Sequence, residues 1–356
     1  MKIVAVVGAR PNFMKIAPLM WELNRRPGVQ TCLVHTGQHY DHKMSHLFFE
    51  ELRIPRPDVN LDVGSGSHAV QTAEVMKRFE PVVLQEKPDV VLVVGDVNST
   101  VACTLTAVKL GVPVGHVEAG LRSFDRGMPE EINRLVTDVI SHWLFASEQS
   151  GVDNLRREGI PEERIHLVGN VMIDTLLASR ALSERSTILE DLGLAGKDYA
   201  VLTLHRPANV DNPAVLAGLF KAIGRLGTEL PIIFPVHPRS RGSLSGMGET
   251  PGLRMIDPLG YLDFMKLLSR SRMALTDSGG VQEETTVLGV PCLTLRENTE
   301  RPSTIDQGTN CLVGLNPEKI IAAGLDVLAK PAITEGRRPD LWDGHAAVRI
   351  VDILTR

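Results

Sequence analysis

Short apolar, β-branched runs alternate along this chain with longer stretches of helical spacing, and the alternation starts twice. The first series begins with KIVAVV at residues 2–7, continues through VVLVV at 90–94 and reaches HVEAG at 116–120. The second series begins with YAVLTLHRP at 199–207. Alternating strands and helices predict βαβ units with right-handed crossovers. We therefore expect an α/β protein with two parallel-sheet domains in tandem.

The length of 356 residues agrees with two domains, because it exceeds the size of most single cores. An internal repeat supports this organisation. In each half a strand ends in Asp, at Asp96 and Asp277, and is followed by a small-residue turn, a helix closing at Leu-Gly-Val-Pro and another strand. Ligands of open parallel sheets bind at the carboxyl ends of the strands. We expect the loops at these ends to line a cleft between the two α/β domains.

Composition excludes several classes of function. The formal net charge of −5 argues against a nucleic-acid or membrane-surface partner, since both need a clustered positive field. No signal peptide or span of roughly twenty apolar residues is evident, because KIVAVVGAR is short and contains Gly8 and Arg10. We expect a soluble cytoplasmic protein.

The cysteines lie in apolar segments without C-x-x-C spacing. This pattern predicts small core residues rather than zinc ligands or disulfides, and a catalytic thiol is the less favoured alternative. The four residues are Cys32, Cys103, Cys292 and Cys311.

The stretch GARPNFMKIAPL, residues 8–19, has two cations that a turn from strand to helix does not require. Such a turn needs only the Gly and the Pro, whereas Arg10 and Lys15 are additional. Backbone N–H groups and the dipole at a helix N-terminus already favour negative charge. We predict that Arg10 and Lys15 bind an anion, with phosphate as the first candidate.

The stretch DSGGVQEE, residues 277–284, predicts a second phosphate site. Ser278 is a suitable N-cap, the paired glycines after it let a ligand approach the backbone, and the exposed N–H groups can hold a diphosphate. Glu283 or Glu284 can accept hydrogen bonds from ribose hydroxyls. A capped helix whose acidic residues complement its own dipole is the alternative. Neither the dinucleotide G-x-G-x-x-G pattern nor the P-loop pattern occurs.

Three carboxylates stand at strand ends or in the loops that follow: Asp96, Glu118 and Glu130. A parallel sheet can bring them together, and crowded carboxylates can share acid and base roles near neutral pH. For Asp96, capping of the next helix is an alternative. Metal binding by His116 and Glu118 is also conceivable, but no third ligand is obvious.

Aromatic and basic residues add further candidates. His205 and Arg206 end the first strand of the second half, where they can grip a diphosphate; a hydrogen-bonded structural histidine is the alternative. Phe264, in YLDFMKLL, belongs to a helix core but can also offer a face to a base. His39 and His237 are ambiguous.

Seven motifs taken in order resemble the non-hydrolysing UDP-N-acetylglucosamine 2-epimerases, and the resemblance spans nearly the whole chain. No single motif is decisive, but chance does not explain seven in sequence. They are GARPNFMKIAPL, TGQHYD, GDVNST, HVEAGLRS, MPEEINR, HRPANVD and DSGGVQEE followed by ERP.

This resemblance implies a GT-B-like pair of Rossmann-type domains. The first would cover residues 1–170 together with a C-terminal helix at about 343–356, and the second, which binds UDP, would cover 171–342. It also implies a homodimer without cofactor or metal that interconverts UDP-GlcNAc and UDP-ManNAc for surface polysaccharide. The resembling enzymes eliminate UDP in anti fashion to form 2-acetamidoglucal and then add UDP back on the reprotonated sugar.

The resemblance also implies roles for single residues. The acid and base groups would be Asp96, Glu118 and Glu130, with His205 assisting at the leaving group. The UDP-sugar would be held by Arg10, Lys15, Arg134, Phe264, Ser278, Gly279, Gly280 and Glu284.

Two departures from the family pattern concern the substrate and its regulation. Asn12 stands where the better-known motif has Glu, and HRPANVD differs from the HRREN form of enzymes that a second UDP-GlcNAc molecule activates. The residues near that second site would be Gln38, His39, Arg206 and His237. Relatives that act on diacetamido-uronic acids share these departures, so a modified UDP-sugar is an alternative substrate.

Three other functions remain open. A GT-B glycosyltransferase would share the fold but need an acceptor site, a hydrolysing epimerase would release free ManNAc and UDP, and a non-catalytic sensor would bind the nucleotide sugar without turnover.

Overall fold

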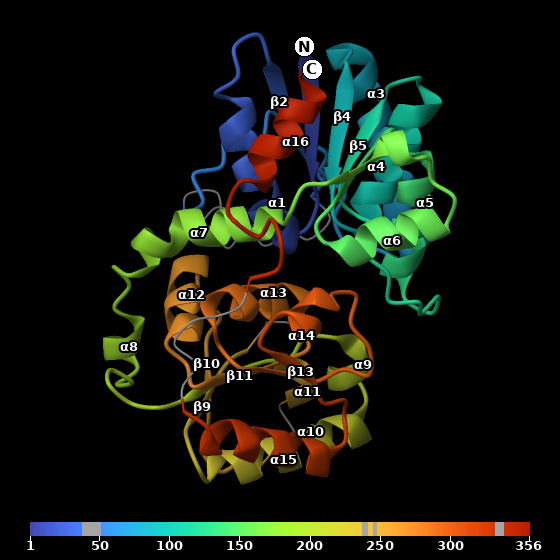
Figure 1. The fold of residues 1–356 in the computed structure, drawn as a ribbon. Helices are drawn as coiled ribbons and strands as arrows, with labels where there is room; N and C mark the ends of the chain where they lie inside the picture. Colours follow the sequence, from blue (N-terminus) through green and yellow to red (C-terminus); the bar gives the residue numbers. More distant parts are fainter. Residues whose placement is uncertain (38–50, 237–240, 245–247, 332–337) are drawn as a thin grey trace. The chain divides into compact units, whose positions relative to one another are not determined.

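The computed structural model describes residues 1–37, 51–236, 241–244, 248–331 and 338–356 (Figure 1). Gln38, His39 and His237 lie outside these ranges, and Arg10 is described only through its backbone, as the first residue of a helix. The chain divides into two compact units. Unit 1 comprises Met1–Ala178 and Asp340–Arg356, and unit 2 comprises Ser179–Pro339.

Unit 1 is a parallel sheet with helices on its faces. Its strands are β1 (Lys2–Val7), β2 (Gln30–His35), β3 (Val59–Asn60), β4 (Val90–Val94), β5 (Val114–Ala119), β6 (Trp143–Ala146) and β7 (Ile165–Leu167). Its helices are α1 (Arg10–Leu23), α3 (His68–Glu86), α4 (Asn98–Lys109), α5 (Pro129–Ile140), α6 (Gln149–Arg157), a 3₁₀ turn (Glu162–Arg164), α7 (Val171–Ser183), in which the division between units falls, and α16 (Ala346–Leu354).

The strand order of unit 1 is β3-β2-β1-β4-β5-β6-β7, and neighbouring strands run parallel. The chain therefore winds outward from β1 on one side and continues from β4 on the other. The point between β1 and β4 is the topological switch, where open α/β sheets bind ligands beyond the carboxyl ends of the strands.

Unit 2 repeats this organisation on a smaller scale. Its strands are β8 (Ala200–Thr203), β9 (Ile232–Pro235), β10 (Leu253–Ile256), β11 (Met273–Thr276), β12 (Cys292–Thr294) and β13 (Asn310–Leu312). Its helices are α8 (Ile188–Asp191), α9 (Pro207–Val210), α10 (Pro213–Gly227), α11 (Arg241–Leu244), α12 (Tyr261–Ser269), α13 (Gly279–Leu288), α14 (Ser303–Asp306) and α15 (Pro317–Ala329).

The order of the second sheet is β10-β9-β8-β11-β12-β13. The predicted class, α/β with two parallel sheets, is therefore confirmed. The sequence repeat corresponds to equivalent strands in the two sheets. Asp96 follows β4, which pairs with the first strand of its sheet, β1, and Asp277 follows β11, which pairs with the first strand of the other sheet, β8.

Alternation along the strands builds a core on both faces of each sheet. In unit 1, Val4 and Val6 of β1 pack with Phe79 of α3 and Ala102 of α4, while α16 packs beside α1 (Figure 1). In unit 2, α10 and α15 cover one face and α12 and α13 the other. Within the described ranges, no helix is long and apolar enough to cross a membrane.

The prediction that all four cysteines are core residues is wrong for one of them. Cys32, Cys103 and Cys292 are buried, whereas Cys311 is exposed. Cys311 lies on β13, the edge strand of the second sheet, where the neighbouring Leu312 is also exposed. An apolar segment on an edge strand leaves side chains uncovered that a central strand would bury.

Candidate functional site

The switch point of unit 1 holds a buried ion pair between two predicted site residues. Lys15 projects from α1, and its Nζ donates to Oε2 of Glu118 at the end of β5. Both side chains are almost fully buried. A buried charge needs a partner, so this contact fixes where the Glu118 carboxylate lies. Lys15 thus contacts a protein carboxylate here; its contact with phosphate stays a prediction.

Gly95 and Asn12 shape the backbone around this ion pair. Gly95, after β4, has a φ of +68°, and a Cβ there would come within 2.9 Å of Lys15 Nζ and 3.2 Å of Asn12 Nδ2. Asn12 Nδ2 donates to the carbonyl of Val94 at 2.7 Å. Asn12, the departure from the better-known motif, therefore ties the start of α1 to the end of β4, a bond that a Glu carboxylate could not donate.

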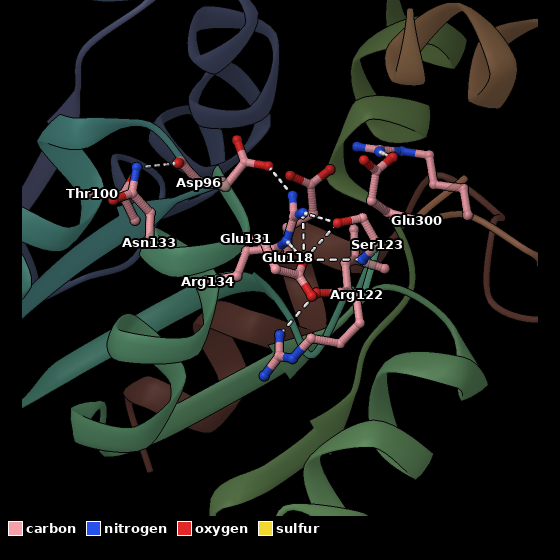
Figure 2. Close-up of polar contacts among 12 residues, drawn as sticks. Asp96, Thr100, Glu118, Arg122, Ser123, Glu131, Asn133, Arg134 and Glu300 are labelled. Carbon is pink, nitrogen blue, oxygen red and sulfur yellow. Dashed lines mark hydrogen bonds and ion pairs between the residues drawn. The ribbon is translucent and has the colours of Figure 1, made fainter. Parts of the chain in front are cut away.

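Asp96 is held by an arginine that also contacts a second carboxylate (Figure 2). Arg134 Nη1 lies 2.5 Å from Asp96 Oδ2, and its Nη2 lies 2.7 Å from Glu131 Oε2. Glu131 also accepts from the backbone N–H groups of Ser123 and Phe124. Burial alone would raise the pKa of Glu131, but the hydrogen bonds from Ser123 and the charge of Arg134 hold it below its usual value. Arg134 is thus anchored on Glu131 and directs its other nitrogen at Asp96.

The structure decides one alternative considered for the candidate carboxylates and shows the surroundings of each. Asp96 does not cap α4, whose N-cap is Val97 without a side-chain bond. Asp96 and Glu118 each face a buried cation. Glu130, the third candidate, is exposed in the first turn of α5.

The switch point of unit 2 holds a histidine and a carboxylate. His205, after β8, has Nδ1 at 2.9 Å from Oδ1 of Asp277, after β11. Asp277 is fully buried and also accepts from the backbone N–H groups of His205 and Arg206 and from Asn209 Nδ2. Burial alone would raise the pKa of Asp277, but the His205 side chain and the backbone N–H groups of Arg206 and His205 hold it below its usual value. An ionised Asp277 keeps the proton on Nδ1 and leaves Nε2 of the half-exposed His205 for other partners.

The predicted phosphate site has the expected local geometry. Ser278 caps α13, its Oγ accepting from Val281 N at 3.5 Å, as predicted. A Cβ on Gly279 would lie 2.6 Å from Nη1 of Arg301, so only glycine lets this guanidinium approach the helix N-terminus. Arg301 is held in turn by Glu283 Oε1 at 2.6 Å. A cation and backbone N–H groups at one helix end form a site suited to a diphosphate.

Glu284 lies deeper in the same helix and is buried. Burial first, and then the charge of Glu283, raise its pKa to about 8, although a hydrogen bond from Tyr261 works in the opposite direction. The carboxyl is therefore neutral at pH 7. Phe264, the candidate for base stacking, is partly buried and packs against the core of unit 2.

This raised pKa gives a testable pH dependence. The folded state holds the Glu284 proton up to about pH 8, whereas the unfolded state loses it near 4.5, so this group makes the free energy of unfolding fall as pH rises between those values. Glu284→Gln should remove that slope and be more stable than the parent at pH 8.5. Denaturant titrations from pH 4.5 to 9 check this, and parallel profiles of the two proteins would contradict it.

Arg206, predicted near a second site, takes part in a buried network of unit 2. Its Nη2 lies 3.6 Å from Oε1 of Glu300, which also forms a two-bonded pair with Arg296. Burial would raise the pKa of Glu300, but the surrounding arginines hold it far below its usual value.

The metal alternative gains no support from His116, whose ring nitrogens contact Asp138 and the Gly95 carbonyl. Among the residues that the structure describes, no group of three His, Cys, Asp or Glu side chains could hold a metal ion.

Sequence reasoning missed three residues of these sites: Glu131, Asp277 and Arg301. Asp277 carried a signal, because it ends a strand in the repeated pattern. Arg301 is the Arg of the quoted ERP string but was given no role. The sequence favours Glu130 over its neighbour Glu131 as the candidate acid or base, and only the turn of α5 shows that Glu131 is the one that is buried.

Comparisons with known proteins show which family this chain is similar to. A model of the family described as UDP-N-acetylglucosamine 2-epimerase matches residues 21–355. The UDP-2,3-diacetamido-2,3-dideoxy-D-glucuronate 2-epimerase of Pseudomonas aeruginosa is 41% identical over 362 residues, covering 100% of both chains. The crystal structure of Methanocaldococcus jannaschii UDP-GlcNAc 2-epimerase, in complex with UDP-GlcNAc and UDP, has 43% identity and a TM-score of 0.93, covering 100% of this chain and 99% of that one.

A more distant likeness concerns the fold alone. The glycotransferase of kitacinnamycin has 14% identity and a TM-score of 0.61, over 100% of this chain and 98% of that one. Together with the two parallel sheets, this confirms the prediction of a GT-B-like α/β fold.

Proposed function

This chain belongs to the UDP-N-acetylglucosamine 2-epimerase family, and on that premise we propose that it interconverts UDP-GlcNAc and UDP-ManNAc. The observation that supports the proposal most directly is the pair of carboxylates at the ends of adjacent strands, Asp96 after β4 and Glu118 near the end of β5, each with its own buried cation. Such placement suits proton transfer at a sugar carbon rather than transfer to an acceptor.

The chemistry follows from the position of the proton. C2 of the sugar is not adjacent to a carbonyl, so its proton is not removed by enolisation. A carboxylate takes the C2 proton while the C1–O bond breaks, the electron pair leaves with UDP, and a C1=C2 bond forms in 2-acetamidoglucal. Protonation of C2 from the opposite face and return of UDP to C1 complete the epimerisation. Asp96, Glu118 and Glu130 are the candidates for these transfers.

In this proposal unit 2 holds the leaving group throughout. Ser278, Gly279 and Gly280 offer the helix N-terminus to the diphosphate, and Arg301 adds a charge-assisted contact. His205, oriented by Asp277, assists departure and return of UDP. Phe264 and Glu284 are the candidates for contacts to uracil and ribose. Arg10 and Lys15 of unit 1 are further candidates for contacts to the UDP-sugar.

A proton NMR time course with UDP-GlcNAc in D2O tests the function. We expect deuterium to enter C2 while a UDP-ManNAc signal grows and UDP stays bound to sugar at equilibrium. Accumulation of free ManNAc and UDP would show a hydrolysing enzyme instead. Absence of any change with this substrate and with the modified sugar below would contradict the epimerase function.

One observation supports a modified UDP-sugar as an alternative substrate. The Pseudomonas aeruginosa relative, named for a diacetamido-glucuronate, matches the full length of this chain at 41% identity. Comparison of kcat/KM for UDP-GlcNAc and for UDP-2,3-diacetamido-2,3-dideoxy-D-glucuronate decides between the two sugars. We expect the higher value for UDP-GlcNAc, and a tenfold preference for the uronic acid would reassign the substrate.

We also propose that the protein is a homodimer. Helix α5 exposes an apolar row, with Ile132 at 43%, Val136 at 39% and Val139 at 56% exposure, and the nearby Phe124 at 69%. Covering such a row by a second copy removes apolar surface from water. Light scattering should give twice the mass of one chain for the parent and a lower mass for Val136→Glu. A monomeric parent protein would exclude the dimer.

A further inference from the structure

The backbone at Glu118 adopts a conformation that L-residues rarely hold. Its φ is +72°, and the pairing of β5 with β6 shifts register between Val117 and Ala119, so Glu118 is the extra residue of a bulge. Left-handed non-glycine residues persist only where their surroundings enforce them. The carboxylate direction toward Lys15 therefore depends on whatever holds residues 116–122.

One buried carboxylate holds both sides of this bulge. Asp138, on α5, accepts from His116 Nδ1 at 2.6 Å, from Gly120 N at 3.1 Å and from Arg122 Nη2 at 2.7 Å. These three donors flank Glu118 in the sequence, one before it and two after it. Asp138 is fully buried, so no solvent competes for these bonds.

The charge state of His116 follows from its partners. Nδ1 contacts the Asp138 carboxylate, and Nε2 lies 2.8 Å from the carbonyl oxygen of Gly95. Both partners are acceptors, so both ring nitrogens must carry protons. Arg122, the other cation that contacts Asp138, also forms a two-bonded ion pair with Glu158. The two cations and two anions of this cluster sum to zero charge. Burial raises the pKa of Asp138, but the two cations outweigh burial and hold it below its usual value.

His116 also connects the two candidate carboxylates. Its Nε2 contacts the carbonyl oxygen of Gly95, which directly precedes Asp96, while Glu118 follows His116 by two residues in β5. A shift of this ring would therefore move the backbone beside both groups.

We propose that Asp138 and His116 are positioning residues that fix Glu118 and the Gly95–Asp96 turn for C2 proton transfer. This inference rests on the epimerase function proposed above. Misplacement of a reacting group by about 1 Å can lower a rate about 100-fold without contact between the altered residue and the substrate.

The charge state is tested first, on the parent protein and without any substrate. Side-chain ¹⁵N NMR distinguishes imidazolium from either neutral tautomer, and the His116 signals are those that disappear in His116→Asn. Because both ring nitrogens face acceptors, we expect both to carry protons in the folded protein at pH 7. A bare nitrogen at that pH would overturn the proposal.

The positioning role is tested with Asp138→Asn. We expect kcat to fall about 100-fold, KM to change less than about threefold and UDP affinity in calorimetry to stay unchanged, because the candidate UDP site belongs to unit 2. Asp153→Asn, which alters an exposed acid on α6, is the matched control and should keep the parent kcat. Parent kcat in Asp138→Asn would overturn the proposal.

Two further outcomes separate this proposal from the function itself. If the parent protein epimerises neither sugar, the proposed function fails, while a crystal structure of Asp138→Asn still decides the positioning. In that variant we expect Glu118 to leave the left-handed region, and an unchanged φ would overturn the inference. If Asp138→Asn does not fold, the NMR measurement on the parent protein decides.

Discussion

Replacing Glu118 by Gln is expected to lower kcat for C2 epimerisation about 1,000-fold, within the range for loss of a general acid or base. Glutamine keeps the size of the side chain but can neither take nor give the C2 proton. UDP affinity should stay within about twofold, since the candidate diphosphate site lies at the N-terminus of α13 in unit 2. Deuterium entry at C2, followed by NMR, measures the step directly, and calorimetry measures UDP binding.

The substitution also leaves Lys15 buried without its counter-charge, which costs about 3–5 kcal/mol when one partner of a buried pair is removed. The double variant Lys15→Met with Glu118→Gln removes both charges and should recover most of that stability. It should not recover the rate of deuterium entry. Recovery of both would show that the loss came from folding rather than from proton transfer.

Glu163→Gln serves as the control, because Glu163 is an exposed acid of unit 1 outside the described site. It should retain the parent kcat. A Glu118→Gln protein that folds, binds UDP and epimerises at the parent rate would remove Glu118 from the reaction.

His205→Asn is the second substitution with a large expected effect, a fall in kcat of about 100- to 1,000-fold. Asparagine still offers a polar group near Asp277, but it cannot exchange a proton with the departing UDP. Asp277→Asn should have a smaller effect, because the imidazole remains and only its orientation and tautomer are less well fixed. The order of the two losses, measured as kcat at saturating substrate, checks the assignment.

His345→Asn is the control for this pair, since His345 is exposed at the start of α16 and its side chain makes no capping bond. Equal losses in His205→Asn and Asp277→Asn would indicate that the carboxylate acts by holding the β8 turn together. Parent activity in His205→Asn would exclude a role for His205 at the leaving group.

Local chemistry made some features predictable. The alternation of short β-branched runs with helical spacing predicted two parallel sheets, and the structure confirms them. Ser278 was predicted as an N-cap from its place between a strand and paired glycines, and it caps α13. These signals lie within a few residues of one another, where backbone preferences and hydrogen bonds act without help from distant segments.

Other features needed the assembled sheets. Asp138 lies inside an amphipathic helix, and no feature of the neighbouring sequence distinguishes it from an acidic residue on the surface. Only the packing of α5 beside β5 brings it to His116, Gly120 and Arg122. Likewise Cys311 resembles a core residue in the sequence and becomes exposed because β13 is an edge strand.

The sequence by itself determined the parallel α/β architecture and the strand ends that carry ionisable side chains, because periodicity and turn chemistry are local. Only the tertiary structure decided which charges meet. Lys15 and Glu118 are 103 residues apart, Arg134 and Asp96 are 38 apart, and His205 and Asp277 are 72 apart. Each pair forms because strand order and helix packing bring distant segments together, and burial then makes an unpaired charge too costly to leave.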